Sequence, residues 1–442
     1  MLTFIIIVLF FVIFFNIYPN IAIQFFIIIS TVIPINFTSN AFKIVVGNID
    51  FSINDLIFYS LILSIILKSF SNKKTFINNK YVIIFLLINL FYFFYGIIFN
   101  KNIAQSLFDI RPILFYSLLL VNFKKLNCTI SPNKVIDSFL FAVALYSFMC
   151  ISILYFKDSH PYFIFLEDEN FIKLGRISFQ QDMLLIIAIP ILFNLLIDLR
   201  KHFFKKIFYN ICLILCLIKL LVSMGRGLIS IVLLCVLFLL IKRQKEFSLK
   251  NFIKKSFKTF LRLAIIITVL VNIQIIYSDL FSLDYLILRF ADSISLDTNF
   301  QIYQINNRLL MWITGLNECI KSYFIGNGYG YTFSINHSEW AGKKISFIDS
   351  AYVTLIIRSG ILSVAFLFLI YFKILQRINF LTKYNFDKVI YTPLIISIYF
   401  ILIVSIFNSY IIYSISNFTL LLVLSYICNY YSFFKSKFRT LV

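Results

Sequence analysis

Long apolar runs recur along the whole of this chain and constrain its fold more than any other feature. Runs of about 17–25 apolar residues are long enough to cross the roughly 30 Å hydrocarbon core of a bilayer as α-helices. Of the 442 residues, 61% are hydrophobic, 19% are aromatic and only 13% are charged, which lies far outside the range of soluble globular proteins. The sequence therefore predicts a polytopic integral membrane protein.

The expected fold is an all-α helical bundle, because a segment in lipid must satisfy its own backbone hydrogen bonds. The alternating apolar and polar residues of a β-barrel are not seen in the sequence. Residues 1–37 hold two apolar stretches broken at Pro19, and the next span ends near Lys68. Ten further spans are expected at 81–99, 104–121, 135–156, 183–199, 207–223, 227–241, 263–277, 350–372, 389–407 and 410–428. The total is about 12 transmembrane helices if residues 1–37 cross once, which we favour, and 13 if they cross twice.

The formal net charge of +21 is explained by topology. Six loop segments hold 26 of the 40 Lys and Arg residues but only Glu246 and Asp387 of the 19 acidic residues. They are 68–80, 124–134, 200–206, 242–262, 373–388 and 435–439. By the positive-inside rule these are cytoplasmic loops that contact anionic lipid, and nucleic-acid binding is not supported.

With the basic loops inside, two substantial segments are expected on the outer side. The smaller is 157–182, and the larger is 278–349, which carries both Trp residues and a cluster of three glycines. We expect residues 1–442 to form a single transmembrane domain with 278–349 as its large extracytoplasmic loop. Neither a disulfide framework nor metal-ligand spacing emerges from the seven cysteines, and no metal or cofactor is expected.

The Lys and Arg residues outside the predicted cytoplasmic loops are fewer, and they are the candidates for functional roles. Arginine grips phosphate oxygens with a planar pair of donors, so several such residues beside lipid suit a lipid diphosphate. Snorkelling to headgroups and ion pairing are the structural alternatives. Arg358, expected nine residues past Asp349 in a helix, and Asp109 and Arg111 suit buried ion pairs. The candidate substrate-binding residues are Arg176, Arg226, Arg308, Arg289, Arg358, Trp312 and Tyr352.

Three residues of the large loop are candidates for acid-base catalysis: His337, Glu339 and Asp349. Asp349 stands at the start of an expected span, where a general base would meet an acceptor hydroxyl near the membrane surface. An Asp at a helix start is equally an ordinary N-terminal cap. The segment IGNGYGYTF, which contains Gly326, Gly328 and Gly330, predicts a tight turn with positive φ rather than a nucleotide-binding loop.

Four patches resemble the family of O-antigen polymerases and O-antigen ligases, which are bacterial envelope glycosyltransferases. GRISFQQDMLLIIAIPILF resembles its Gly-Arg patch before a span, and SMGRGLISIVLL its Ser-Arg-Gly turn, with Gly225 before Arg226 in place of the usual Ser. RLLMWITGLNECIKSYFIGNGYG resembles its Arg-x-x-x-Trp helix and Gly-x-Gly turn. IDSAYVTLIIRSGILSVAFLFL resembles its polar doublet, aromatic residue and span.

The resemblance implies metal-independent, inverting transfer of a glycan from an undecaprenyl diphosphate carrier at the periplasmic face of the bacterial inner membrane. Arg176, Arg226 and Arg308 would hold the diphosphate or position sugars. Asp349-Ser350 stands where ligases have His and Asn, which favours a Wzy-like polymerase of oligosaccharide repeat units. The alternatives are a ligase that transfers glycan to lipid A-core and a flippase or exporter of lipid-linked sugars. A chain-length regulator and a flippase are possible partners.

Overall fold

The computed structural model describes residues 2–33, 44–46, 49–71, 79–156, 180–198, 203–223, 226–243, 299–334, 344–345, 348, 350–383, 388–408 and 416–439. These residues are almost entirely helical. The expected span 263–277 and nearly all of the segment 157–182 lie outside these ranges, as does much of 278–349.

The first half of the described chain contains α1 (Leu2–Ile17), α2 (Pro19–Val32), α3 (Ile53–Ser71), α4 (Lys80–Asn100), α5 (Ile103–Leu114) and α6 (Pro132–Phe156). Two 3-10 helices follow α5, η1 (Phe115–Leu120) and η2 (Phe123–Leu126). The second half contains η5 (Gln180–Leu184), α8 (Leu185–Asp198), α9 (Phe203–Val222), α10 (Arg226–Arg243), α13 (Asn299–Lys321), α14 (Ala351–Lys383), α15 (Lys388–Val404) and α17 (Ser416–Arg439).

Strands are few and short in the described residues. Strands β1 (Ile44–Val46) and β2 (Ile49–Phe51) form an antiparallel pair, and so do β3 (Phe333–Ser334) and β4 (Lys344–Ile345). In the second pair Phe333 lies opposite Ile345. The fold class predicted from the apolar runs, all-α, is confirmed at this level.

Among the residues that the structure describes, five helical segments are long and apolar enough to cross a membrane: Lys80–Asn100, Ile103–Leu120, Pro132–Ser152, Gln181–Asp198 and Ala351–Thr382. Shorter apolar helices cover Phe4–Ile17, Pro19–Val32, Gly227–Lys242 and Lys388–Val404. This is the character of a membrane-embedded protein. The expected total of 12 spans stays a prediction.

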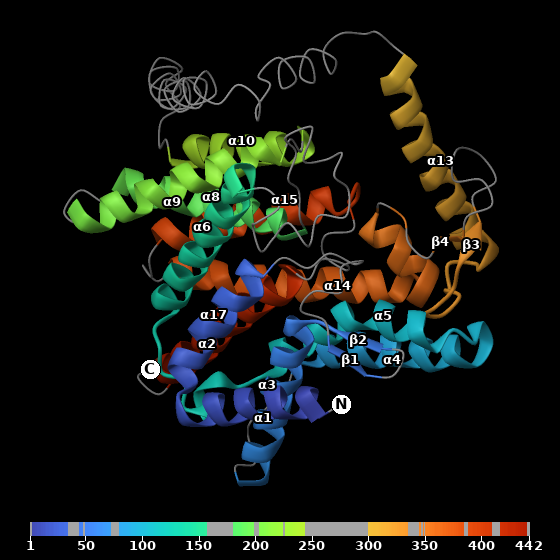
Figure 1. Ribbon diagram of the computed structural model, residues 1–442, viewed down its shortest axis with the longest axis horizontal. Coiled ribbons are helices and arrows are strands. Elements are labelled where there is room, and N and C mark those ends of the chain that lie inside the picture. The colour runs from blue at the N-terminus through green and yellow to red at the C-terminus, as the bar shows by residue number, and fades with distance from the viewer. Residues whose placement is uncertain are drawn as a thin grey trace.

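The helices pack around one large apolar core. Helix α4 packs along α14, α2 along α6, and α8 against α9, α10 and α15 (Figure 1). Prolines lie at the start of α2 and in the last turn of α5. Pro19 begins α2, where its missing N–H costs no hydrogen bond, and Pro112 lies inside α5 shortly before the chain tightens into η1.

Helix α14 is interrupted at Gly360, which has φ 76° and ψ 172°. The sequence predicts a span over 350–372, with Arg358 about 13 Å along it at 1.5 Å per residue. Ala351–Thr382 is indeed apolar and long enough to cross a membrane, but the break at Gly360 was not foreseen. Gly360 adopts a positive φ that other residues disfavour, so the first segment of α14 ends just after Arg358 and a second begins at Ile361.

The loop after α13 lies directly on α4. A Cβ atom built on Gly96 of α4 would overlap the backbone of Tyr329 in this loop, and one built on Gly328 would lie 2.8 Å from the Cα of Gly96. The two glycines therefore allow two backbones to approach more closely than side chains permit.

We expect Gly96→Ala to lower the thermal unfolding midpoint of the purified protein in detergent. Alanine favours a helix interior by about 1 kcal/mol over glycine. Here its methyl group would push the Tyr329 backbone away, and such overpacking costs about 1–3 kcal/mol.

Gly227→Ala is the matched control, because nothing lies within 4 Å of a Cβ at that position in α10. It should leave the midpoint unchanged or raise it. A Gly96→Ala protein as stable as the parent would contradict the close approach.

Candidate functional site

At the break in α14, backbone groups of the helix form hydrogen bonds with the loop of residues 322–330, which we call the glycine loop. The amide of Asn327 donates to the carbonyl oxygen of Ile357 at 2.6 Å, and that of Gly328 to Arg358 at 2.9 Å. In return, the amide of Ile361 donates to the carbonyl oxygen of Phe324 at 3.0 Å. Non-helical backbone within a membrane protein needs such partners, because lipid supplies none.

The glycine loop owes its shape to positive φ angles. Gly326, Gly328 and Gly330 have φ values of 108°, 82° and 76°. Tyr323 and Phe324 also have positive φ, at 49° and 59°. The tight turn with positive φ that the sequence predicts for the glycine cluster is therefore confirmed.

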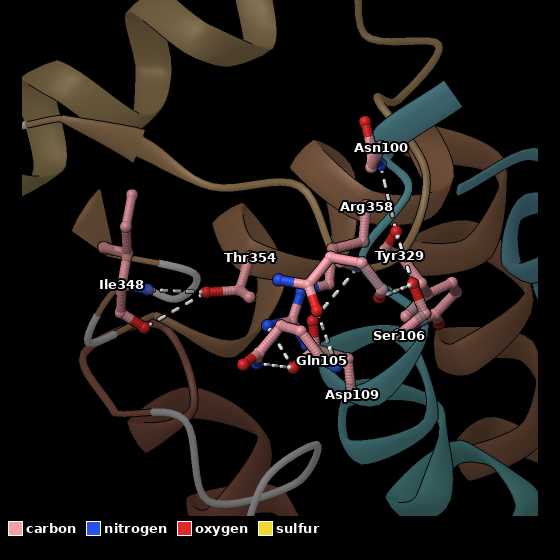
Figure 2. A network of polar contacts seen from close by, with 10 residues as sticks. Asn100, Gln105, Ser106, Asp109, Tyr329, Ile348, Thr354 and Arg358 are labelled. Carbon is pink, nitrogen blue, oxygen red and sulfur yellow. Dashed lines mark hydrogen bonds and ion pairs between the residues drawn. The ribbon is translucent and has the colours of Figure 1, made fainter. Parts of the chain in front are cut away.

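A buried ion pair lies beneath the loop, between Arg358 at the break and Asp109 of α5. Arg358 Nη2 lies 2.8 Å from Asp109 Oδ1, and each side chain is 1% exposed. Gln105 Nε2 donates to the same Asp109 oxygen at 2.7 Å, and the amide of Gly330 donates to Oδ2 at 3.3 Å (Figure 2). The ion pairs that the sequence analysis considered for Asp109 and Arg358 are one and the same pair.

Tyr329 ties the glycine loop to two helices. Its carbonyl oxygen accepts hydrogen bonds from Asn100 Nδ2 and Ser106 Oγ, both at 3.0 Å (Figure 2). Its hydroxyl donates to Asn89 Oδ1, and its ring lies 6.0 Å from the guanidinium carbon of Arg358. The loop is thus held by α4, α5 and α14 together.

Two more ion pairs lie among the helices. Arg111 Nη1 lies 3.2 Å from Asp55 Oδ2, and Ser52 donates to the same oxygen from its amide and its hydroxyl. The second pair joins α9 to the start of η5, with Lys219 Nζ 2.6 Å from Asp182 Oδ1.

Tyr146 of α6 also donates to Asp182 Oδ1, at 2.7 Å. Buried charges inside a membrane protein are costly unless paired, so the three pairs mark polar places in an otherwise apolar bundle. The pairing of Lys219 with Asp182 could not be predicted from the sequence, although a charge within or beside an apolar run is the signal that a partner exists.

All three pairs lie near helix ends that the sequence predicts to face outward. Asp55 and Asp182 are in the first turns of α3 and η5, and Lys219 is in the last turn of α9. Asp109 and Arg111 lie within eight residues of the start of α5, and Arg358 within eight residues of the start of α14. Eight residues of helix correspond to about 12 Å. On the predicted topology, all three pairs would lie on the outward-facing side of the bundle.

The predicted site residues fall into three groups. Arg358, Trp312 and Tyr352 have described side chains, whereas Arg226 and Arg308 lie in α10 and α13 with only their backbones described. Five others belong to the ranges that the structure leaves undescribed: Arg176, Arg289, His337, Glu339 and Asp349. Their predicted roles stay predictions.

Arg358, Trp312 and Tyr352 each contact a different partner. Arg358 pairs with Asp109, whereas the Trp312 ring stacks on Phe407 with centroids 5.5 Å apart. Tyr352 is buried, and its hydroxyl donates to the carbonyl oxygen of Leu402 at 2.7 Å. Within the described part of the chain, no three His, Cys, Asp or Glu side chains are grouped to hold a metal ion.

Comparisons of the chain with models of protein families, with curated proteins and with solved structures gave no match.

Glu318 joins the end of α13 to the segment after the glycine loop. Its carboxylate accepts hydrogen bonds from Lys321 Nζ at 2.5 Å and from the Tyr331 hydroxyl at 2.7 Å. Burial acts to raise the pKa of Glu318, but the hydrogen bonds from Lys321 and Tyr331 outweigh it and hold this pKa below its ordinary value. Burial, aided by the bond to Glu318, raises the pKa of Tyr331 to about 12.

We expect a double-mutant cycle to show strong coupling between Asp109 and Arg358. Asp109→Asn or Arg358→Met alone leaves a buried charge without its ion partner, which typically costs about 3–5 kcal/mol. The double variant should lose less stability than the sum of the two, measured by thermal unfolding in detergent.

Lys321→Met is the control for the cycle. It breaks the Lys321–Glu318 pair, whose lysine side chain is 70% exposed, so we expect a smaller loss of stability than at the fully buried pair. Additive effects at Asp109 and Arg358 would show that the two charges do not stabilise each other.

We expect Glu318→Gln to lower the unfolding midpoint at neutral pH but not in acid. A carboxyl whose pKa is lowered by folding stabilises the protein above its unfolded pKa, and this contribution is lost as the pH falls through the folded value. The difference in midpoint between parent and variant should therefore shrink as the pH is lowered from 7 to 3. A constant difference over that range would contradict the lowered pKa.

Proposed function

We propose that this protein polymerises oligosaccharide repeat units carried on undecaprenyl diphosphate, at the outer face of the bacterial inner membrane. The observation that carries the proposal is the gathering of buried charges beneath the helix ends predicted to face outward. A membrane enzyme that acts on a lipid diphosphate needs its polar groups at the headgroup level. The resemblance of four sequence patches to O-antigen polymerases and ligases supports the same function.

The position of the charges favours an enzyme over a flippase. A flippase moves a polar headgroup across the bilayer, so its cations should line a path through the whole membrane depth. The described buried charges of the bundle instead lie within about 12 Å of one set of helix ends. A flippase or exporter of the same lipid-linked sugars is therefore the second candidate.

The proposed reaction is an inverting glycosyl transfer without a metal. The hydroxyl of the acceptor sugar attacks the anomeric carbon of the donor, and the bond from that carbon to the diphosphate oxygen breaks. The hydroxyl proton passes to a general base, for which Asp349, His337 and Glu339 are the candidates. Undecaprenyl diphosphate leaves with the bonding electron pair, and arginines at its oxygens would stabilise its developing charge.

The arginines proposed for this role are Arg176, Arg226 and Arg308. Arg226 is the first residue of α10, and Arg308 lies in α13, which packs against α14 beside the glycine loop. Arg358 is engaged with Asp109 in this structure. A ligase is the alternative enzyme, and Asp349-Ser350 in place of a His-Asn doublet favours the polymerase.

Deletion of the gene, followed by gel analysis of surface polysaccharide, separates the three functions. If the protein is a polymerase, deletion should leave a single repeat unit on the lipid core. A normal ladder that remains on the carrier would indicate a ligase. Loss of all external carrier-linked glycan, with accumulation in the cytoplasm, would indicate a flippase.

We expect Arg176→Ala and Arg308→Ala each to abolish chain extension without changing the amount of protein in the membrane. Arg308→Lys should retain part of the activity, because lysine keeps the charge but loses the paired donors of arginine. Lys205→Ala is the control, since Lys205 is an exposed cation of an expected cytoplasmic loop. Normal polymer in both alanine variants would refute the arginine clamp.

A further inference from the structure

The exposed face of α13 carries an apolar stripe beside exposed Asn317 and Lys321. Ile313, Leu316 and Ile320 are 45%, 43% and 57% exposed and follow one another at helical spacing. At 100° per residue they form one stripe. Thr314, Asn317, Glu318 and Lys321 lie along one side of this stripe.

The opposite face of α13 is packed on the protein. A Cβ atom on Gly315 would contact the side chains of Ile348 and Val353, and Cys319 is fully buried. Trp312 stacks on Phe407, after α15. These contacts fix the rotation of the helix, so the apolar stripe points away from the bundle.

The stripe continues onto a helix that has the character of a membrane span. The chain passes from Ile320 into the glycine loop, where Ile325 is 62% exposed. The hydrogen bond from Ile361 to Phe324 places the loop beside the start of the second segment of α14. There Ile361 and Leu362 are exposed as well. A single apolar surface therefore runs from α13 to α14.

The direction of α13 differs from that of the helices it meets. In Figure 1 the gold ribbon of α13 runs at a steep angle to α14, α4 and α5, and it packs against α14 without lying along it. Although it has 23 residues, α13 is not among the described helices apolar enough to cross a membrane. A helix of this kind lies in the plane of the membrane surface with one face in the lipid.

We propose that α13 is an interfacial helix whose stripe of Ile313, Leu316 and Ile320 lies in the acyl chains of the outer leaflet. Lipid fits this surface better than a second protein copy. A stable protein interface takes about 20–30 residues from each side, and the stripe with its continuation offers far fewer. Lys321, 70% exposed beside the stripe, reaches headgroup phosphates from the same helix.

This placement of α13 has one consequence for the proposed function, and that consequence alone rests on the proposed function. Arg308 lies on α13 about two turns before Gly315. A helix that rests in the outer leaflet holds its backbone at the level of lipid phosphates. The diphosphate of a lipid-linked donor would then meet Arg308 without leaving the membrane surface.

Nitroxide labels test the position of α13 directly. Single cysteines replace Ile313, Leu316, Ile320, Asn317 or Lys321, and the full chain is reconstituted in vesicles of phosphatidylethanolamine and phosphatidylglycerol. The seven native cysteines are buried, and the unmutated chain serves as the labelling blank. Collisions with oxygen, which concentrates in lipid, are compared with collisions with a water-soluble nickel chelate.

At the three stripe positions we expect oxygen collisions to exceed chelate collisions several-fold, and at Lys321 we expect the reverse. Chelate collisions at Leu316 as frequent as at Lys321 would place the stripe in water and overturn the proposal. Low collision rates with both probes would also overturn it, by showing that a protein surface covers the stripe. Neither result depends on polymer synthesis, so the proposed function and this placement fail independently.

Discussion

The absence of water inside a bilayer is the constraint on which this structure depends. A helix broken within an apolar bundle exposes amides and carbonyls that lipid cannot satisfy. The protein meets this constraint at Gly360 by bringing in the glycine loop, whose amides and carbonyls replace the missing helical partners. The charge of Arg358 at the same place is balanced by Asp109. The broken helix, the loop and the ion pair therefore stabilise one another.

Helix α5 connects two of the three ion pairs found among the described helices apart from the exposed Lys321–Glu318 pair, because it carries both Asp109 and Arg111. Asp109 reaches α14, and Arg111 reaches Asp55 in α3. Such pairs are weak sources of net stability, since desolvation offsets most of their attraction. What the pairs do define is which groups face each other, because α5 meets α14 through Asp109 and α3 through Arg111.

Much of the helical framework was accessible from the sequence, because apolar runs and basic loops are local signals. The runs at 81–99 and 135–156 correspond to α4 and α6 within a few residues. The need of Asp109 and Arg358 for partners was also visible, since an isolated charge in an apolar run is costly. Their pairing was not, because local sequence does not show which distant segments meet. The break at Gly360 was missed for a related reason. A lone glycine in an apolar run is tolerated in many continuous helices.

The glycine loop also explains how the buried pair and α13 depend on each other. The loop begins where α13 ends, and its Gly330 amide bonds to Asp109. A change at Asp109 would therefore act first on the glycine loop and, through the covalent chain, on the C-terminal end of α13. If α13 carries the arginine that meets the donor, we expect Asp109 to influence that arginine by this route alone, without touching the substrate. Loss of polymer in an Asp109 variant would then reflect displacement of α13, and only variants of Arg308 itself report on contact with the diphosphate.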